Sequence, residues 1–244
     1  MPLTYDTIGV DYANLRKPDP RIGALIEGAL DDARTVLNVG AGAGSYEPAG
    51  KIVTALEPST EMIRQRPASA ALVIQGVAED LPFDDKAFDA VMGVNTVHHW
   101  TDRAKGCAEM RRVATGRIVL LTFDPAHRGA WLIDYFPELA ALDDAQMPQI
   151  ADYAGWLGAV DIAPVPVPHD CTDGFLYAYW RRPQAYLDDK VRAAMSSFWA
   201  IGDAADKGLA RLKADLDSGA WEKRYGALLD QDTCDVGYRL VTTG

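Results

Sequence analysis

Three glycines and one glutamate form the most informative chemical pattern in the chain. The apolar run at residues 36–40 ends in Gly40, and Gly42 and Gly44 follow at alternate positions. Glycines after a buried strand let the backbone turn sharply and approach a ligand closely. Glu57 ends the next apolar run, where its carboxylate can accept hydrogen bonds from both hydroxyls of a ribose. This order of loop and carboxylate predicts a site for a nucleoside-containing cofactor.

The spacing within this loop separates two classes of cofactor. A dinucleotide-binding fingerprint reads G-x-G-x-x-G, and its third glycine would fall at Ser45, whereas this loop reads G-x-G-x-G. Pro48 and Gly50 leave barely one turn of helix before the next strand, and a pyrophosphate needs the N–H groups of a well-formed helix N-terminus. The sequence therefore favours a cofactor without phosphates, and an NAD-dependent oxidoreductase is the alternative.

Alternating strands and helices must hold this loop in place. Short apolar runs predict strands at residues 35–40, 52–57, 71–76, 88–94 and 116–123. Apolar residues at helical spacing predict a helix over 21–31, and a capping residue before a charged segment predicts another over 101–114. Continuous apolar strands separated by helices are typical of a parallel sheet that is covered on both faces.

The second half of the chain is richer in aromatic residues. Of the 22 aromatic residues, 6 precede residue 123 and 16 lie at or beyond it, which predicts an aromatic-lined helical addition to the sheet. Residues 160–168 are extended but interrupted by prolines, so they predict an edge strand at most. We expect one α/β domain over residues 1–244, made of a lid segment at 1–20, a cofactor-binding core at 21–124, a helical cap at 125–235 and a last strand at 236–243.

Four ordered motifs resemble those of the class I S-adenosylmethionine-dependent methyltransferases of the small-molecule, type 11 kind. They are VLNVGAGAG at 36–44, ALEPS at 55–59, GVAEDLPFDDKAFDAVMGVNTVHHW at 76–100 and MRRVATGRIVLLTFDP at 110–125. The resemblance implies a Rossmann-like, doubly wound sheet that is mostly parallel, with the last strand antiparallel, and a helical cap. It also implies methyl transfer from S-adenosylmethionine to a small molecule. Asn38 departs from the family, which usually has aspartate at this position.

The resemblance also implies which residues hold the cofactor. Glu57 would bind the ribose hydroxyls, Met62 would lie on the adenine face and Glu79 would accept from the adenine amine. Asn95 would face the methionine amino group, and Arg16 would pair with the methionine carboxylate. The full set implied for cofactor binding is Tyr12, Arg16, Gly40, Ala41, Gly42, Gly44, Glu57, Pro58, Met62, Ala78, Glu79 and Asn95.

Histidines are the candidate bases for the chemistry, because a methyl acceptor with an oxygen or nitrogen nucleophile can need one. His98 and His99 follow a predicted strand at the mouth of the expected site, although one of them could instead cap the next helix or fix the loop. The residues expected to shape the acceptor pocket are His127, Trp131, His169 and Phe175. A protein that binds the cofactor without turnover is a second alternative.

Composition narrows the class of protein further. The 244 residues carry a formal net charge of −11, which argues against nucleic-acid binding. Three dispersed cysteines predict neither a metal site nor a disulfide framework, and no run is apolar enough for a membrane span. We expect a cytoplasmic enzyme, monomer or homodimer, that acts on a small molecule without a metal. Paired aspartates, among them residues 143–144, are interpreted as solvated turns and helix starts.

Overall fold

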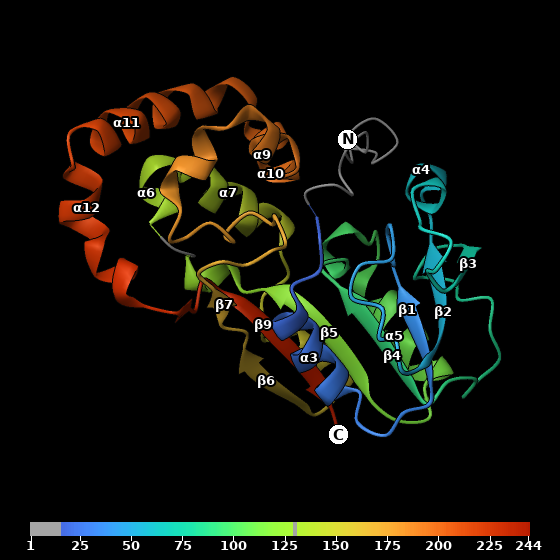
Figure 1. Cartoon of the computed structure of the whole chain (residues 1–244). Helices are drawn as coiled ribbons and strands as arrows, with labels where there is room; N and C mark the ends of the chain where they lie inside the picture. Colours follow the sequence, from blue (N-terminus) through green and yellow to red (C-terminus); the bar gives the residue numbers. More distant parts are fainter. Residues whose placement is uncertain (1–15, 129–130) are drawn as a thin grey trace.

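A seven-stranded sheet forms the centre of the computed structural model, which describes residues 16–128 and 131–244 (Figure 1). Its strands run in the order β3-β2-β1-β4-β5-β9-β6. Their bounds are β1 Thr35–Val39, β2 Ile52–Glu57, β3 Leu72–Gln75, β4 Ala90–Val94, β5 Ile118–Phe123, β6 Val160–Pro164 and β9 Tyr238–Thr243. Strands β1 to β5 pair in parallel, and β9 pairs antiparallel with both β5 and β6. The predicted doubly wound sheet with an antiparallel last strand is confirmed.

Burial on both faces explains why these segments form strands without apolar–polar alternation. All six residues of β5 are buried, as are the last four of β1. Successive residues of a strand point to opposite faces of the sheet. Val36 of β1 and Met92 of β4 pack with Ile22 and Ile26 of helix α3 (Pro20–Ala29), whereas Leu37 of β1 packs with Met110 on the opposite face. The continuous apolar runs are therefore the signature of a sheet between two helical layers.

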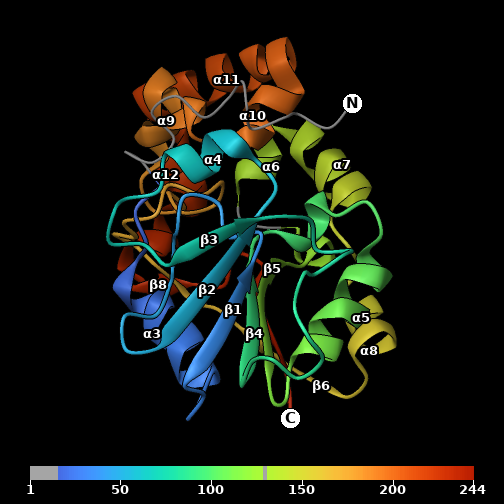
Figure 2. The same ribbon diagram turned by 90° about the vertical axis from the view of Figure 1, so that its right-hand side faces the viewer.

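Helices cover the two faces of this sheet unequally. Helix α3 lies against one face, and α5 (Arg103–Val113) and α8 (Asp152–Leu157) pack together on the other (Figure 2). The order in which strands are added reverses at β1, so that β2 and β3 lie on one side of it and β4 and β5 on the other. The carboxyl ends of strands flanking such a reversal form a crevice, which is where doubly wound folds bind ligands.

A helical cap lies beyond these strand ends (Figure 1). It is built from α6 (Leu132–Tyr135), α7 (Pro137–Gln146), α9 (Asp189–Ala193), α10 (Ser196–Ile201), α11 (Ala205–Asp217) and α12 (Ala220–Tyr225). The ring of Trp131 packs against those of Tyr135, Tyr186, Trp221 and Tyr225, at centroid distances of 5.7, 5.6, 5.4 and 6.0 Å. The structure differs from the expected continuous cap over 125–235, because α8 and β6 join the sheet layers.

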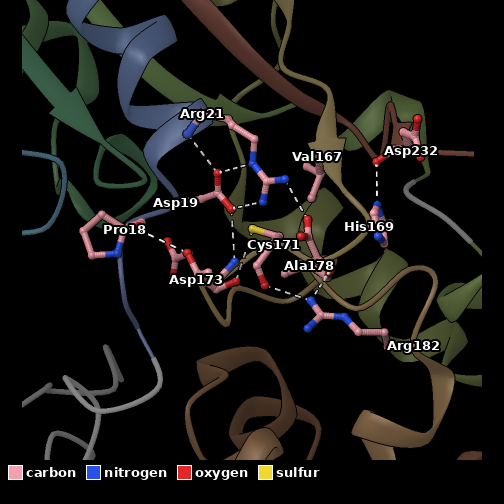
Figure 3. A network of polar contacts seen from close by, with 12 residues as sticks. Pro18, Asp19, Arg21, Val167, His169, Cys171, Asp173, Ala178, Arg182 and Asp232 are labelled. Atoms are coloured by element: carbon pink, nitrogen blue, oxygen red, sulfur yellow. Dashed lines mark hydrogen bonds and ion pairs between the residues drawn. The ribbon is translucent and has the colours of Figure 1, made fainter.

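A polar network ties the chain before α3 to the segment that follows the two-residue strand β7 (Val167–Pro168) (Figure 3). Asp19 is fully buried at the N-cap of α3 and accepts from the backbone N–H groups of Arg21 at 2.9 Å and Thr172 at 3.1 Å. Arg16 Nε lies 2.6 Å from Asp173 Oδ1, and the Tyr46 hydroxyl donates to Asp173 Oδ2 at 2.9 Å. These contacts hold the start of α3 against residues 172–173.

Replacing Asp19 by asparagine is expected to destabilise the protein at neutral pH but not at pH 2. Burial raises the pKa of Asp19, and hydrogen bonds from Arg21 and Thr172 outweigh it and hold the pKa at about 2. A carboxyl with a lowered folded-state pKa contributes stability above its unfolded pKa of about 3.9, and this contribution, about 2–3 kcal/mol, is lost as the pH falls toward 2. Thermal unfolding at pH 7, 4 and 2 would measure it. Asp170→Asn, which removes an exposed partner of Arg21, is the control and should have little effect at any pH.

Candidate active site

A cavity of about 590 Å³ opens at the carboxyl ends of the parallel strands. On the sheet side its wall is formed by the glycine loop after β1, the end of β2 and the segments that follow β3 and β4. On the cap side its wall comes from α7, α10 and the chain around Phe175, and Phe123 and Tyr238 also line the cavity. The cavity therefore joins the predicted cofactor loop to the aromatic half of the chain, with room for two small ligands.

Positive backbone φ angles explain the glycines of the loop. Gly40, Gly42 and Gly44 have φ of 68°, 52° and 95°. The N–H groups of Gly40 and Ala41 both donate to the carbonyl of Leu56, at 2.8 and 3.0 Å, so the loop is fixed to β2. Gly40, Ala41 and Gly42 line the cavity, whereas Gly44 lies outside the lining.

A buried ion pair holds the same loop from behind. Arg66 donates to the carbonyl of Gly42 at 3.0 Å and lies 2.5 Å from Glu47, and both charged side chains are almost completely buried. Glu47 also accepts from the backbone N–H of Ala71 at 2.9 Å. The sequence reasoning missed this pair, because neither residue belongs to a strand end or a glycine motif.

Glu57 is oriented by the backbone around it. Its side chain is buried in the cavity wall, with Oε2 accepting from the Gly42 N–H at 2.8 Å and Oε1 from the Ser59 N–H at 2.9 Å. Ser59 caps the short helix α4 (Thr60–Arg64), which places buried Met62 in the lining beside Pro58. A carboxylate held by two N–H groups keeps lone pairs that can accept from ligand hydroxyls.

The segments after β3 and β4 complete this part of the wall. Ala78 is buried and lines the cavity. Glu79 also lines it, but its Oε1 accepts from the N–H groups of Thr101 at 2.7 Å and Asp102 at 3.0 Å, so this carboxylate anchors the start of α5. Asn95 follows β4 in the left-handed region, with φ of 49°, and it lines the cavity.

Asn38 indicates whether the residues of this wall suit the implied cofactor. It is 1 % exposed and lines the cavity, and its Oδ1 has no hydrogen-bond partner among the residues that the structure describes. A buried acceptor without a donor is costly unless a ligand or water supplies one. An ammonium group such as that of S-adenosylmethionine would satisfy it, so the residues present fit the implied cofactor.

The histidine pair lies in the same cavity. His98 and His99 end a 3-10 turn, Val97–His99, after β4, and their ring centroids are 3.9 Å apart. Desolvation by the surrounding protein lowers the pKa of both rings, although His99 keeps contact with solvent. The charges of Arg103 and of His99, when it is protonated, lower the pKa of His98 further. Both imidazoles are therefore neutral at pH 7, which is the form that accepts a proton.

Only some of the other predicted residues line the cavity. Arg16 and Phe175 line the cavity, and Tyr12 falls outside the described residues. The remaining three are absent from the lining. His127 contacts the Asp235 carbonyl at 3.0 Å and accepts from Arg239 at 3.1 Å, His169 contacts the Asp232 carbonyl at 3.2 Å, and Trp131 is buried in the aromatic cluster of the cap.

Asp143 is a cavity residue that the sequence reasoning placed in solvent. It is 5 % exposed, and the Tyr177 hydroxyl donates to its Oδ2 at 2.8 Å. Leu139 and Asp143 are the buried residues of α7, one turn apart. An acidic residue on the apolar stripe of a helix was the signal that could have revealed it.

Comparisons with known proteins agree with this geometry. Residues 37–120 match the family described as "Methyltransferase domain". A solved structure of a putative methyltransferase from an antibiotic biosynthesis pathway of Anabaena variabilis is 36% identical and superposes with a TM-score of 0.88, over 94% of this chain and 99% of that one. The chain belongs to the class I S-adenosylmethionine-dependent methyltransferases. Membership in this methyltransferase family confirms S-adenosylmethionine as the cofactor in place of NAD.

Curated relatives of this methyltransferase are more distant. The 2-methyl-6-phytyl-1,4-hydroquinone methyltransferase 1 of rice is 28% identical over 62% of this chain. The demethylmenaquinone methyltransferase of Deinococcus radiodurans is 33% identical over 45% of it. The chain spans about half the length of these relatives, 50% and 51%. Across residues 16–128 and 131–244, no helix is long and apolar enough to cross a membrane, and no cluster of three potential ligands could hold a metal.

Proposed function

We propose that this protein transfers a methyl group from S-adenosylmethionine to an oxygen or nitrogen atom of a small molecule. One observation carries the proposal: a single cavity is lined by the glycine loop and Glu57 and also by the rings of Phe123, Phe175, Tyr177 and Tyr238, whose part of the cavity we call the second lobe. Cofactor and acceptor can therefore meet without crossing solvent. The names of the curated relatives indicate hydroquinone and menaquinone acceptors for those proteins, which supports a small-molecule acceptor here.

The residues of the wall would hold the cofactor by polar and apolar contacts. Glu57 would accept from the ribose hydroxyls, Asn38 would accept from the methionine ammonium, and Met62 and Ala78 would pack on the adenine. When bound, S-adenosylmethionine supplies a methyl group on a positively charged sulfur, which already activates it for transfer. The protein then needs mainly to align the acceptor and exclude water.

The histidine pair would manage the acceptor proton. A hydroxyl acceptor must lose its proton to give the neutral ether, and an ammonium acceptor must lose one before its nitrogen has a lone pair to attack with; the neutral ring of His98 or His99 can take that proton. Because both pKa values are lowered, the base form persists over the whole neutral range. We expect kcat, measured at saturating acceptor, to stay level from about pH 8 to about pH 6 and to show no titration near the ordinary histidine pKa of about 6.5.

Separate His98→Ala and His99→Ala variants are expected to differ in turnover. The variant that loses the base should lose about 10²- to 10⁴-fold in kcat, and both should bind S-adenosylhomocysteine normally. Formation of S-adenosylhomocysteine in the presence of an active cell extract gives the rate, and calorimetry gives the affinity. Equal and near-normal turnover in both variants would remove the histidines from the chemistry and leave alignment alone.

Isotope labelling tests the proposed reaction itself. The purified protein is incubated with extract and methyl-labelled S-adenosylmethionine, and mass spectrometry searches for a labelled small molecule. We expect a product that is heavier by one labelled methyl group and absent with the Glu57→Ala variant. Tight cofactor binding without any labelled product would favour the alternative of a non-catalytic binding protein.

A further inference from the structure

The second lobe of the cavity holds a carboxylate among aromatic rings. Phe123 stacks on Tyr177 at a centroid distance of 5.0 Å, and Phe175 packs on Tyr238 at 4.5 Å. All four rings line the cavity, and Asp143 reaches the same space from α7. These rings come from β5, β9 and the chain around residues 175–177, so the lobe is built by sheet and cap together.

The carboxylate of Asp143 has capacity for a further partner. Tyr177 donates to Oδ2, and within residues 16–128 and 131–244 this is the one hydrogen bond that the Asp143 side chain makes. The neighbouring basic side chain, Arg128, is bound to Asp144 at 2.8 Å. Burial raises the pKa of Asp143 to about 6, and the Tyr177 hydrogen bond partly opposes that rise. A positively charged ligand at Oδ1 would reverse this rise and stabilise the ionised form.

The charges around the cavity favour a cation. Glu57, Glu79 and Asp143 line it, and among the described residues the one lysine or arginine in the lining is Arg16, whose Nε is bound to Asp173 at 2.6 Å. Aromatic faces attract organic cations, whereas an anionic acceptor would meet buried carboxylate without a compensating base. The lobe is therefore suited to an ammonium group attached to an apolar body.

We propose that the acceptor of this methyltransferase carries a protonated amine, which binds Asp143 between the aromatic rings of the second lobe. The inference rests on the proposed function. While it is protonated, this nitrogen has no lone pair, so the methylated oxygen or nitrogen is a different atom of the same molecule. Asp143 is thus a residue that selects and positions the acceptor. It does not take the proton that the acceptor loses during methyl transfer.

Binding of three matched probes tests the proposal. 2-Phenylethylamine, 2-phenylethanol and 3-phenylpropionate are titrated by calorimetry into protein saturated with S-adenosylhomocysteine, which occupies the cofactor's own ammonium site. At pH 7.5 we expect the amine to bind at least tenfold more tightly than the alcohol and the propionate not to bind. Asp143→Asn should remove the preference for the amine and leave the affinity for the alcohol unchanged.

The pH dependence of binding and two further variants show whether Asp143 recognises the amine or only supports the fold. The groups that face Asp143 are Tyr177, Tyr238, Asp144 and Arg128. Burial raises the pKa of both tyrosine hydroxyls well above their ordinary range, so neither loses its proton between pH 5 and 7.5. At pH 5 only about a tenth of a carboxyl with a pKa near 6 is ionised, so amine affinity should fall about tenfold while alcohol affinity stays constant. Asp144→Asn removes a like charge that raises the pKa of Asp143, so it should keep the amine preference and move its pH dependence slightly downward. Tyr177→Phe should keep the amine preference and move its pH dependence upward.

The outcomes distinguish this inference from the function on which it rests. Failure of the wild type to bind S-adenosylhomocysteine would overturn the proposed function. Normal binding of S-adenosylhomocysteine with equal affinity for amine and alcohol, or with an amine affinity that Asp143→Asn leaves unchanged, would overturn the role of Asp143 alone. The wild-type ratios at pH 5 and pH 7.5 give this answer even where the Asp143→Asn variant folds poorly.

Discussion

Glu57→Ala is expected to weaken the binding of S-adenosylhomocysteine by at least tenfold. The carboxylate has two tasks: it accepts from the N–H groups of Gly42 and Ser59, and it faces the cavity where the ribose hydroxyls would lie. Alanine removes the acceptor for the ligand and leaves two buried N–H groups without their partner, each of which costs about 1–3 kcal/mol. The unpaired N–H groups lower the stability of the free protein, whereas the lost hydrogen bonds from ligand hydroxyls to a charged group, about 1.5–3 kcal/mol each, lower the affinity. A tenfold loss corresponds to about 1.4 kcal/mol and is therefore the lower bound.

Calorimetry with Glu57→Gln and Glu61→Ala supplies the controls. Glutamine keeps one acceptor oxygen and should lie between wild type and alanine. Glu61 lies four residues further along, in helix α4, and pairs with Arg64, so its removal should leave affinity unchanged. An unchanged affinity in Glu57→Ala would take this carboxylate out of the site.

Gly40→Ala is expected to be the most destabilising change in the cofactor loop, by about 2–5 kcal/mol. Its φ of 68° carries a cost of about 1–2 kcal/mol for any residue with a side chain. A Cβ at this position would also lie 1.9 Å from Thr96 Oγ1 and 2.8 Å from Thr96 Cβ. Thr96 is buried and its hydroxyl accepts from Trp100, so it has little room to move, and overpacking of this kind adds about 1–3 kcal/mol.

Gly42→Ala is the matched control for backbone strain. Its φ of 52° lies in the same region, but the nearest atom to an added Cβ is Met62 Cε, at 3.4 Å. Chemical denaturation should therefore show a loss of only about 1–2 kcal/mol for Gly42→Ala. Equal losses for the two variants would show that contact with Thr96 contributes nothing, and that strain in the backbone alone requires a glycine at position 40.

Local physics explains what could be predicted from the sequence. The strands are continuous apolar runs because helices cover both faces, and this signal needs no knowledge of distant residues. The glycine spacing and Glu57 are local as well, since the turn after β1 and the end of β2 are neighbours in register, with Val39 opposite Leu56. The sheet and the cofactor wall therefore followed from short segments.

Long-range packing explains what was missed. The position of His127 after β5 suggested a pocket residue, but Asp235 and Arg239, more than a hundred residues later, bind both ring nitrogens. The pairing of Asp143 with Tyr177 likewise joins two cap segments that carry no shared motif. Such contacts depend on how the cap helices pack, which hydrophobic periodicity alone does not specify.

The position of β9 between β5 and β6 has a consequence for how the chain folds during its synthesis. While the polypeptide emerges from the ribosome, β1 to β5 can assemble early, but β6 has no neighbour to join until residues 238–243 have been made. Until then β5, an apolar segment, has one unpaired side, and such edges invite association with other nascent chains. Shielding of this strand by a chaperone, or by transient folding of the cap over it, would thus matter most late in translation.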